Sequence, residues 1–184
     1  PVLSDVDSHA ITSELTARAL ASDWVVLAGS LPRGVNTDWY CDLISAVRAA
    51  APQARIAVDT SDAPMQAIGE NLNSAAPDLI KPNGLELGQL TGTDGRELEN
   101  QAARGEYSGV VRAARDVVKQ GIAEVLVTLG GAGAVLVTAD GAWAATPPPA
   151  TVKSTVGAGD AALAGYLLGR TEGKSPADSL AQSV

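Results

Sequence analysis

The sequence has 184 residues, 46% of them hydrophobic, and its 13 basic and 21 acidic residues give a formal net charge of −8. A nucleic-acid partner is excluded, because binding to a phosphate backbone needs clustered Lys and Arg and the sequence has no basic stripe. The single cysteine, Cys41, excludes an intrachain disulfide, and no apolar stretch is long enough for a membrane span. We therefore expect a cytoplasmic, soluble protein with no membrane partner. Because the sequence starts at Pro1 rather than Met and ends at Val184 within a helical pattern, we also expect a fragment of a longer protein.

Apolar runs and turn residues predict alternating helices and strands along the chain. The run Trp24–Ala28 is continuously apolar, which predicts a strand buried on both faces. Thr37 is the expected N-cap of the helix that follows. The predicted helices cover about 8–21, 37–51, 62–73, 86–90, 110–120 and 157–169, and the predicted strands cover 24–28, 56–58, 79–80, 125–129, 134–138 and 142–145.

This alternation predicts an α/β fold with three layers, in which a mostly parallel sheet has helices on both faces. Ligands of such sheets bind beyond the carboxyl ends of the strands. Several Gly, Asn, Thr and Asp residues come directly after predicted strands, so the candidate functional residues are sought there.

The clearest functional motif is the small-residue run from Ser154 to Tyr166, which contains Gly157, Ala158, Gly159 and Asp160 at the start of a helix. Backbone N–H groups of the first three of these four residues can point together at one small anion, and the helix N-terminus adds partial positive charge. Such a turn suits the charge that develops during phosphoryl transfer. Asp160 could take the proton of a substrate hydroxyl. The alternative is that Asp160 only caps its helix and that the glycines only permit tight packing.

From Thr155 to Leu167 the sequence resembles the C-terminal signature of the ribokinase/PfkB family of carbohydrate kinases. Its Ser154-Thr155-Val156 start is similar to the branch that contains 1-phosphofructokinases and tagatose-6-phosphate kinases. The resemblance implies a ribokinase-like fold in which Asp160 is the catalytic base, and also contacts the substrate, while the N–H groups of Gly157, Ala158 and Gly159 form the anion hole. Residues 1–184 would then be a partial nucleotide-binding and catalytic domain.

Asn83 and Glu86 form a second motif, within Lys81-Pro82-Asn83-Gly84-Leu85-Glu86. Residues three apart share a helix face, and these two side chains could orient the waters of a Mg²⁺ ion beside a nucleotide. The alternative is a capping box, in which Asn83 is the N-cap and Glu86 the third helical residue. The resemblance favours the first interpretation, because the family carries an NxxE motif, and it implies that Lys81 contacts the nucleotide phosphates.

Two glycine-containing turns complete the resemblance. The turn with Thr128, Gly130 and Gly133 is similar to the family's segment along the nucleotide phosphates, although a simple tight turn would have the same composition. The segment Gly29–Val35 is similar to a segment of sugar-phosphate kinases, in which Ser30 would face the sugar phosphate; the alternative is a turn forced by Pro and Gly.

The resemblance implies an enzyme that uses ATP and Mg²⁺ to phosphorylate a ketohexose phosphate. Fructose 1-phosphate, giving fructose 1,6-bisphosphate, is the expected substrate, and tagatose 6-phosphate and fructose 6-phosphate are alternatives. The family's lid strands and N-terminal sugar-binding segment are not visible in the sequence, so we expect this chain alone not to close over its substrate. A homodimer of the complete protein is also expected. A non-catalytic nucleotide-binding module remains a rival, because a fold does not determine a function.

Overall fold

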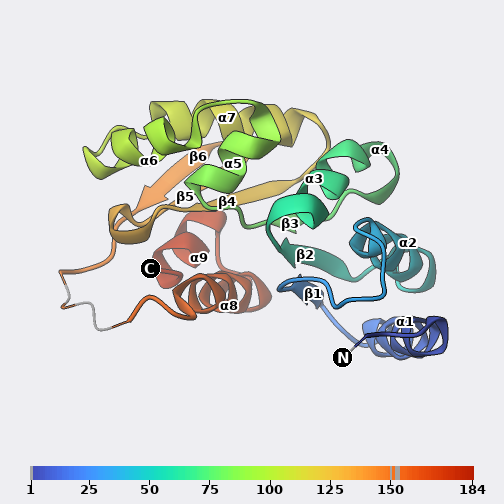
Figure 1. Ribbon diagram of the computed structural model, residues 1–184. Helices are drawn as coiled ribbons and strands as arrows, with labels where there is room; N and C mark the ends of the chain where they lie inside the picture. The colour runs from blue at the N-terminus through green and yellow to red at the C-terminus, as the bar shows by residue number, and fades with distance from the viewer. Residues whose placement is uncertain (1, 150, 152–153) are drawn as a thin grey trace. The chain divides into compact units, whose positions relative to one another are not determined.

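The structure is a computed structural model that describes residues 2–149, 151 and 154–184. The chain, drawn in Figure 1 with its helices and strands labelled, divides into two compact units. Unit 1 comprises Pro1–Ile80 with Gln120–Ile122, and unit 2 comprises Lys81–Lys119 with Ala123–Val184.

The strands of unit 1 are parallel. They are β1 (Trp24–Ala28), β2 (Arg55–Asp59) and β3 (Leu79–Ile80), and β2 pairs with both of the others. In β2 the side chains of Ile56, Ala57 and Val58 are fully buried. Because parallel strands all point the same way, the residues that follow β1 and β2 lie at the same edge.

The helices of unit 1 are α1 (Asp5–Ala19), α2 (Trp39–Ala50), α3 (Asp62–Glu70) and α4 (Leu72–Ala75). Helix α2 packs against the other three. It can do so because its buried residues recur at intervals of three and four, which places Tyr40, Leu43, Ile44 and Val47 on one face.

The strands of unit 2 are antiparallel. They are β4 (Glu124–Thr128), β5 (Ala134–Thr138) and β6 (Ala142–Ala145), and β5 pairs with β4 and β6. The 3₁₀ turn η1 (Gly130–Ala132) joins β4 to β5. The first four residues of both β4 and β5 are buried, so this hairpin carries the core of the unit.

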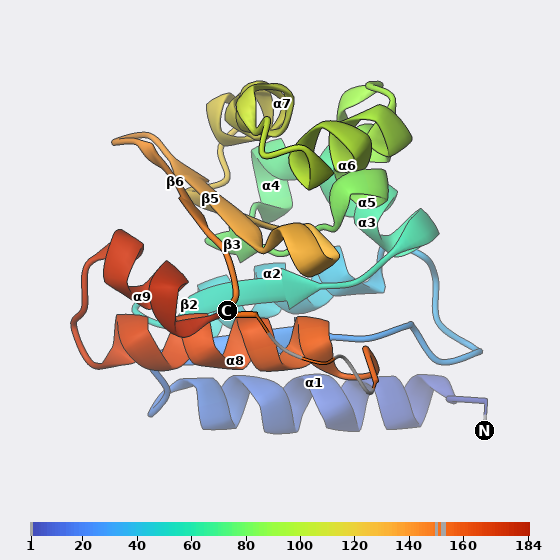
Figure 2. The same cartoon turned by 90° about the vertical axis from the view of Figure 1, so that its left-hand side faces the viewer.

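Helices lie on both sides of these strands. One side carries α5 (Gly84–Thr91), α6 (Gly95–Ala103) and α7 (Ser108–Lys119), and the other carries α8 (Ala158–Thr171) and α9 (Pro176–Gln182), as Figures 1 and 2 show. The glycines Gly165 and Gly169 let α8 and α9 approach closely, since a Cβ atom at Gly165 would lie 2.8 Å from the carbonyl oxygen of Gln182. The predicted layers of helices around a sheet are therefore present in this unit.

Several local predictions were wrong. Strand β1 is not buried on both faces, because Val26 is 44% exposed. The N-cap of α2 is Asp38, not Thr37. The predicted helix after β2 is divided between α3 and α4.

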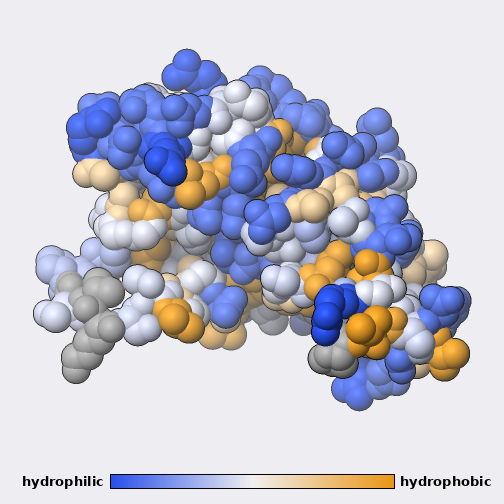
Figure 3. Space-filling view, in the orientation of Figure 1, coloured by the Kyte–Doolittle hydropathy of each residue, from blue (hydrophilic) through white to orange (hydrophobic). Residues whose placement is uncertain are grey.

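Helices α6 and α9 were not predicted, although each has an N-cap signal. The side chain of Asp94 accepts hydrogen bonds from two backbone N–H groups of α6, and that of Ser175 accepts one from Asp178 of α9. Helix α6 buries only Leu98 and Ala102, and its weak apolar pattern matches the hydrophilic surface over it in Figure 3. Within the described ranges, no helix is both long and apolar enough to cross a membrane.

Candidate active site

The turn at the start of α8, where the sequence predicts an anion-binding site, is built around a left-handed glycine. Gly157 is the N-cap and adopts a left-handed conformation with φ +78°. Ala158, Gly159 and Asp160 form the first turn, and Gly157 and Ala158 are exposed. The N–H of Ala158 donates to the carbonyl oxygen of Thr155 at 3.1 Å, so in this structure one of the three predicted donors is engaged within the turn itself.

Asp160 occupies the third position of α8, with an exposed side chain. Among the residues that the structure describes, no side-chain cap is found at the start of this helix. Within the described part of the chain, the Asp160 carboxylate makes no hydrogen bond or ion pair, so it does not act as a helix cap. An accessible carboxylate in the first turn of a helix can accept a proton from a bound hydroxyl.

Lys81 lies beside the same turn, although the two are far apart in the sequence. Its side chain is only 5% exposed. A Cβ atom placed on Gly159 would lie 3.0 Å from the Lys81 ammonium nitrogen and 3.7 Å from Cε. The ammonium group therefore adds its positive charge to the positive end of α8, and an anion in the turn would be attracted by both.

Asn83 and Glu86 form a capping box at the start of α5. Asn83 Oδ1 accepts from the Glu86 N–H at 2.8 Å, and Glu86 Oε2 accepts from the Asn83 N–H at 2.8 Å. The capping interpretation of this motif is therefore present in the structure. It does not exclude contact with a hydrated metal ion, because a carboxylate has two oxygens and several lone pairs.

The end of β4 lies next to this capping box. The N–H of Thr128 donates to the carbonyl oxygen of Pro82 at 3.0 Å, and Thr128 forms an isolated parallel bridge with Asn83. The structure thus brings two of the predicted nucleotide-binding segments together within unit 2.

The turn after Thr128 is tight. The N–H of Leu129 donates to the carbonyl oxygen of Gly133 at 2.8 Å. Gly133 has φ +91°, and a Cβ atom there would collide with the carbonyl oxygen of Ala145. The hydroxyl group of Tyr107, the residue before α7, donates to the Ala132 carbonyl at 2.9 Å and holds the turn. Gly130 also has a positive φ, so the turn depends on glycine at both ends.

The predicted substrate residue Ser30 belongs to unit 1. It is exposed and follows Gly29, which has φ +93°. The N–H of Gly29 donates to the carbonyl oxygen of Asp59 at 2.8 Å, so the ends of β1 and β2 are joined at this point. The buried side chains of Tyr40 and Thr60 also contact this turn, and the sequence analysis did not single them out.

The part of the chain that the structure describes contains neither a cluster of metal ligands nor an exposed thiol. Among residues 2–149, 151 and 154–184, no group of three or more His, Cys, Asp or Glu side chains is arranged to hold a metal ion. Cys41 is buried, and burial followed by the charges of Asp38 and Asp42 raises the pKa of its thiol. The thiol therefore stays protonated and behaves as a core side chain.

Comparison with known proteins identifies relatives along most of the chain. The model of the family described as "pfkB family carbohydrate kinase" matches residues 5–184. The 1-phosphofructokinase of Rhodobacter capsulatus is 41% identical over 177 residues, which are 96% of this chain and 51% of that protein. The 1-phosphofructokinase of Bacillus subtilis is 33% identical over 92% of this chain and 50% of that protein. The chain thus spans about half the length of these relatives.

Solved structures that resemble this chain include a phosphofructokinase and a ribokinase. Phosphofructokinase-2 from Escherichia coli in complex with fructose-6-phosphate matches 97% of this chain and 54% of its own, with a TM-score of 0.78 and 27% identity. Ribokinase from Thermotoga maritima matches 91% of this chain and 50% of its own, with a TM-score of 0.61 and 18% identity, a likeness of fold alone. The predicted ribokinase-like fold is confirmed by these matches.

Proposed function

Because this chain belongs to the pfkB family of carbohydrate kinases, we propose that the protein transfers the γ-phosphoryl group of ATP to a hydroxyl group of a ketohexose phosphate. Residues 1–184 are its nucleotide-binding and catalytic part. One observation carries the proposal: the Lys81 ammonium lies at the start of α8, where Gly157–Gly159 form the turn and Asp160 is exposed in the first helical turn. Positive charge and a carboxylate at one place are what transfer to a hydroxyl requires.

The reaction moves one proton and exchanges one phosphorus–oxygen bond for another. Asp160 takes the proton from the substrate hydroxyl as its oxygen bonds to the γ-phosphorus, and the bond between that phosphorus and the β,γ-bridging oxygen breaks to release ADP. General-base help of this kind contributes about 10²–10⁴-fold to the rate. The N–H groups of Gly157 and Gly159 and the Lys81 ammonium stabilise the negative charge on the transferring group, and the Ala158 N–H joins them once it leaves the Thr155 carbonyl.

The nucleotide phosphates are held in unit 2 by Lys81, Asn83, Glu86 and the turn of Thr128, Gly130 and Gly133. The bridge between Thr128 and Asn83 supports this assignment, since it holds these two segments side by side. Mg²⁺ fits such a site through its waters, because it is usually bound by substrate phosphates and few protein oxygens. The Asn83 and Glu86 side chains would orient those waters, and the metal would neutralise charge on the phosphates.

Fructose 1-phosphate is the substrate we propose first, because the relatives at 41% and 33% identity are named 1-phosphofructokinases. Ser30 would contact its phosphate. Fructose 6-phosphate and tagatose 6-phosphate are the alternatives, the first supported by the Escherichia coli phosphofructokinase-2 complex. An ATP-dependent enzyme of this kind would act in the cytoplasm. We propose that it self-associates as a homodimer, and a tetrameric form is described for the Escherichia coli phosphofructokinase-2.

The test is ADP release by the complete gene product with each of the three sugar phosphates and with unphosphorylated sugars, in the presence and absence of Mg²⁺. We expect Mg²⁺-dependent turnover on one ketohexose phosphate. Asp160→Asn should lower kcat by about 10²-fold or more, while nucleotide binding measured by calorimetry stays near that of the unsubstituted protein. Nucleotide binding without turnover on any sugar phosphate would favour a non-catalytic module, and near-normal turnover by Asp160→Asn would remove the proposed mechanism.

A further inference from the structure

Two buried hydroxyl groups converge on a single backbone carbonyl in unit 1. The Gly29 carbonyl oxygen accepts a hydrogen bond from the Tyr40 hydroxyl at 3.0 Å and another from Thr60 Oγ1 at 2.9 Å. The Tyr40 hydroxyl is also 3.2 Å from the Ala28 carbonyl oxygen. Tyr40 comes from α2 and Thr60 follows β2, so both elements meet at the end of β1.

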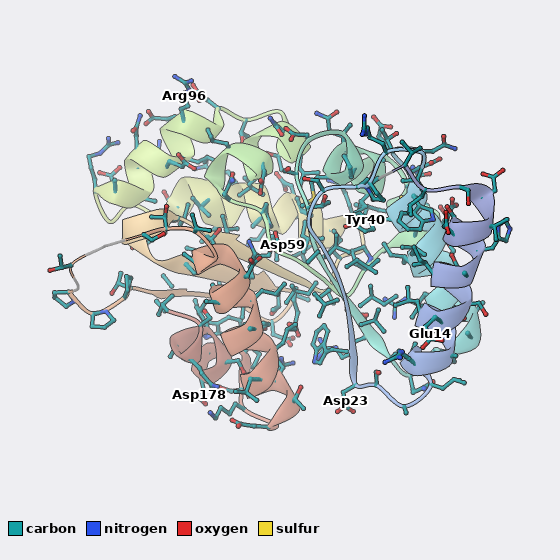
Figure 4. All side chains as sticks on the ribbon, turned by 60° about the horizontal axis from the view of Figure 1, so that its bottom comes forward. Glu14, Asp23, Tyr40, Asp59, Arg96 and Asp178 are labelled. Carbon is teal, nitrogen blue, oxygen red and sulfur yellow. The ribbon has the colours of Figure 1, made fainter. Side chains whose placement is uncertain are left out.

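Both hydroxyl groups are removed from water. Tyr40 is 6% exposed and Thr60 is 4% exposed. Burial, followed by the charge of Asp59, raises the pKa of Tyr40, so the phenol remains a hydrogen-bond donor in the neutral range. Tyr40 and Asp59 are labelled in Figure 4. A buried hydroxyl is costly unless it is hydrogen-bonded. Here the Thr60 hydroxyl donates to the Gly29 carbonyl, and the Tyr40 hydroxyl is shared between the Gly29 carbonyl at 3.0 Å and the Ala28 carbonyl at 3.2 Å.

The two hydrogen bonds determine the direction of the next N–H group. A trans peptide is planar, so its carbonyl and the following N–H point in opposite directions. The described residues contain no cis peptide bond. With the Gly29 carbonyl turned toward the buried Tyr40 and Thr60 hydroxyls, the Ser30 N–H is turned away from them, on a residue that is exposed. The φ of +93° at Gly29 is a conformation that residues with a Cβ atom rarely adopt.

We propose that Tyr40 and Thr60 are positioning residues for the sugar phosphate, because they hold the Gly29–Ser30 peptide with the Ser30 N–H directed at the ligand. This inference rests on the proposed function and adds to it two residues that do not touch the substrate. The Gly29 carbonyl would otherwise be able to turn outward, where it would repel a phosphate oxygen, since both atoms are hydrogen-bond acceptors.

The test compares Thr60→Val, which removes the hydroxyl at nearly constant shape, with Thr60→Ser, which retains it. Both are made in the complete gene product, together with Tyr40→Phe. We expect Thr60→Val and Tyr40→Phe each to raise the KM for the sugar phosphate about five- to tenfold, as for the loss of one hydrogen bond, while the KM for ATP changes less than twofold. Thr60→Ser should restore the KM. Thr16→Val is the matched control, because it removes a hydroxyl that donates to the Thr12 carbonyl at 3.0 Å within α1.

The outcomes separate this inference from the proposed function. If the unsubstituted protein turns over a sugar phosphate and Thr60→Val has the same sugar-phosphate KM, the positioning role alone is overturned. An equal rise in the KM for the sugar phosphate and the KM for ATP would also overturn the positioning role, because it would indicate a general loss of structure. A rise of the same size in the sugar-phosphate KM of Thr16→Val would overturn it for the same reason. Absence of turnover by the unsubstituted protein on every sugar phosphate would refute the proposed function and the positioning role together.

Discussion

Substituting Gly159 by Ala should separate catalysis from stability. Gly159 is the second residue of α8 and has a helical backbone, so the added methyl group brings no backbone strain. The preference for Ala over Gly in a helix interior, about 1 kcal/mol, is the upper limit of the stability gained at this first-turn position. The new Cβ atom would lie 3.0 Å from the Lys81 ammonium nitrogen, which is closer than an ordinary contact. The ammonium group ends a flexible side chain and can move by a few tenths of an ångström, so little stability is lost.

Catalysis should respond differently, because the displaced group is the one proposed to stabilise the transferring phosphoryl group. A misplacement near 1 Å can cost about 10²-fold in rate, and a smaller shift should cost about tenfold. We therefore expect Gly159→Ala to lower kcat about tenfold while the free energy of unfolding, measured by urea denaturation, stays the same or rises by up to about 1 kcal/mol.

The double variant with Lys81→Met tests the physical route of this effect. If the methyl group acts through Lys81, then Gly159→Ala should add little to the loss of kcat caused by Lys81→Met, because coupled residues are not additive. Full additivity, or a kcat for Gly159→Ala equal to that of the unsubstituted protein, would refute the reasoning. A large drop in the unfolding free energy of Gly159→Ala would refute it as well.

Three further substitutions test packing and titration. Gly165→Ala should lower the unfolding free energy by about 1–3 kcal/mol, because its Cβ atom would meet the Gln182 carbonyl of α9; an unchanged urea midpoint would contradict this. Glu124→Gln should lower the unfolding free energy by about 3 kcal/mol, since the Glu124 side chain is 7% exposed and its carboxylate pairs with Arg170 at 3.1 Å. Thermal unfolding measures this loss, and a loss below about 1 kcal/mol would contradict the prediction. Folding raises the pKa of Tyr40, so the protonated phenol contributes to folding stability below its unfolded pKa of about 10, and this stability is lost as pH rises through the folded pKa. Tyr40→Phe should therefore weaken the alkaline loss of stability, measured by urea denaturation from pH 8 to 11.

The sequence by itself determined the elements whose signals are local. Strands β1, β3 and β5 begin and end where the apolar runs do, because Gly, Pro and polar residues interrupt those runs. The capping box of Asn83 and Glu86 was the alternative interpretation of its motif, and the sequence could offer it because the box joins residues three apart. Helices α6 and α9 were missed because few of their residues are apolar, and only their caps mark them.

Only the tertiary structure decided which of these segments meet. No periodicity places the Lys81 ammonium beside Gly159, or Thr128 beside Asn83. The exposure of Val26 and the convergence of Tyr40 and Thr60 on the Gly29 carbonyl were equally hidden. The physical reason is that a residue's own neighbours along the chain specify hydrogen bonds over three or four positions, whereas burial and long-range contacts depend on which other elements pack against it.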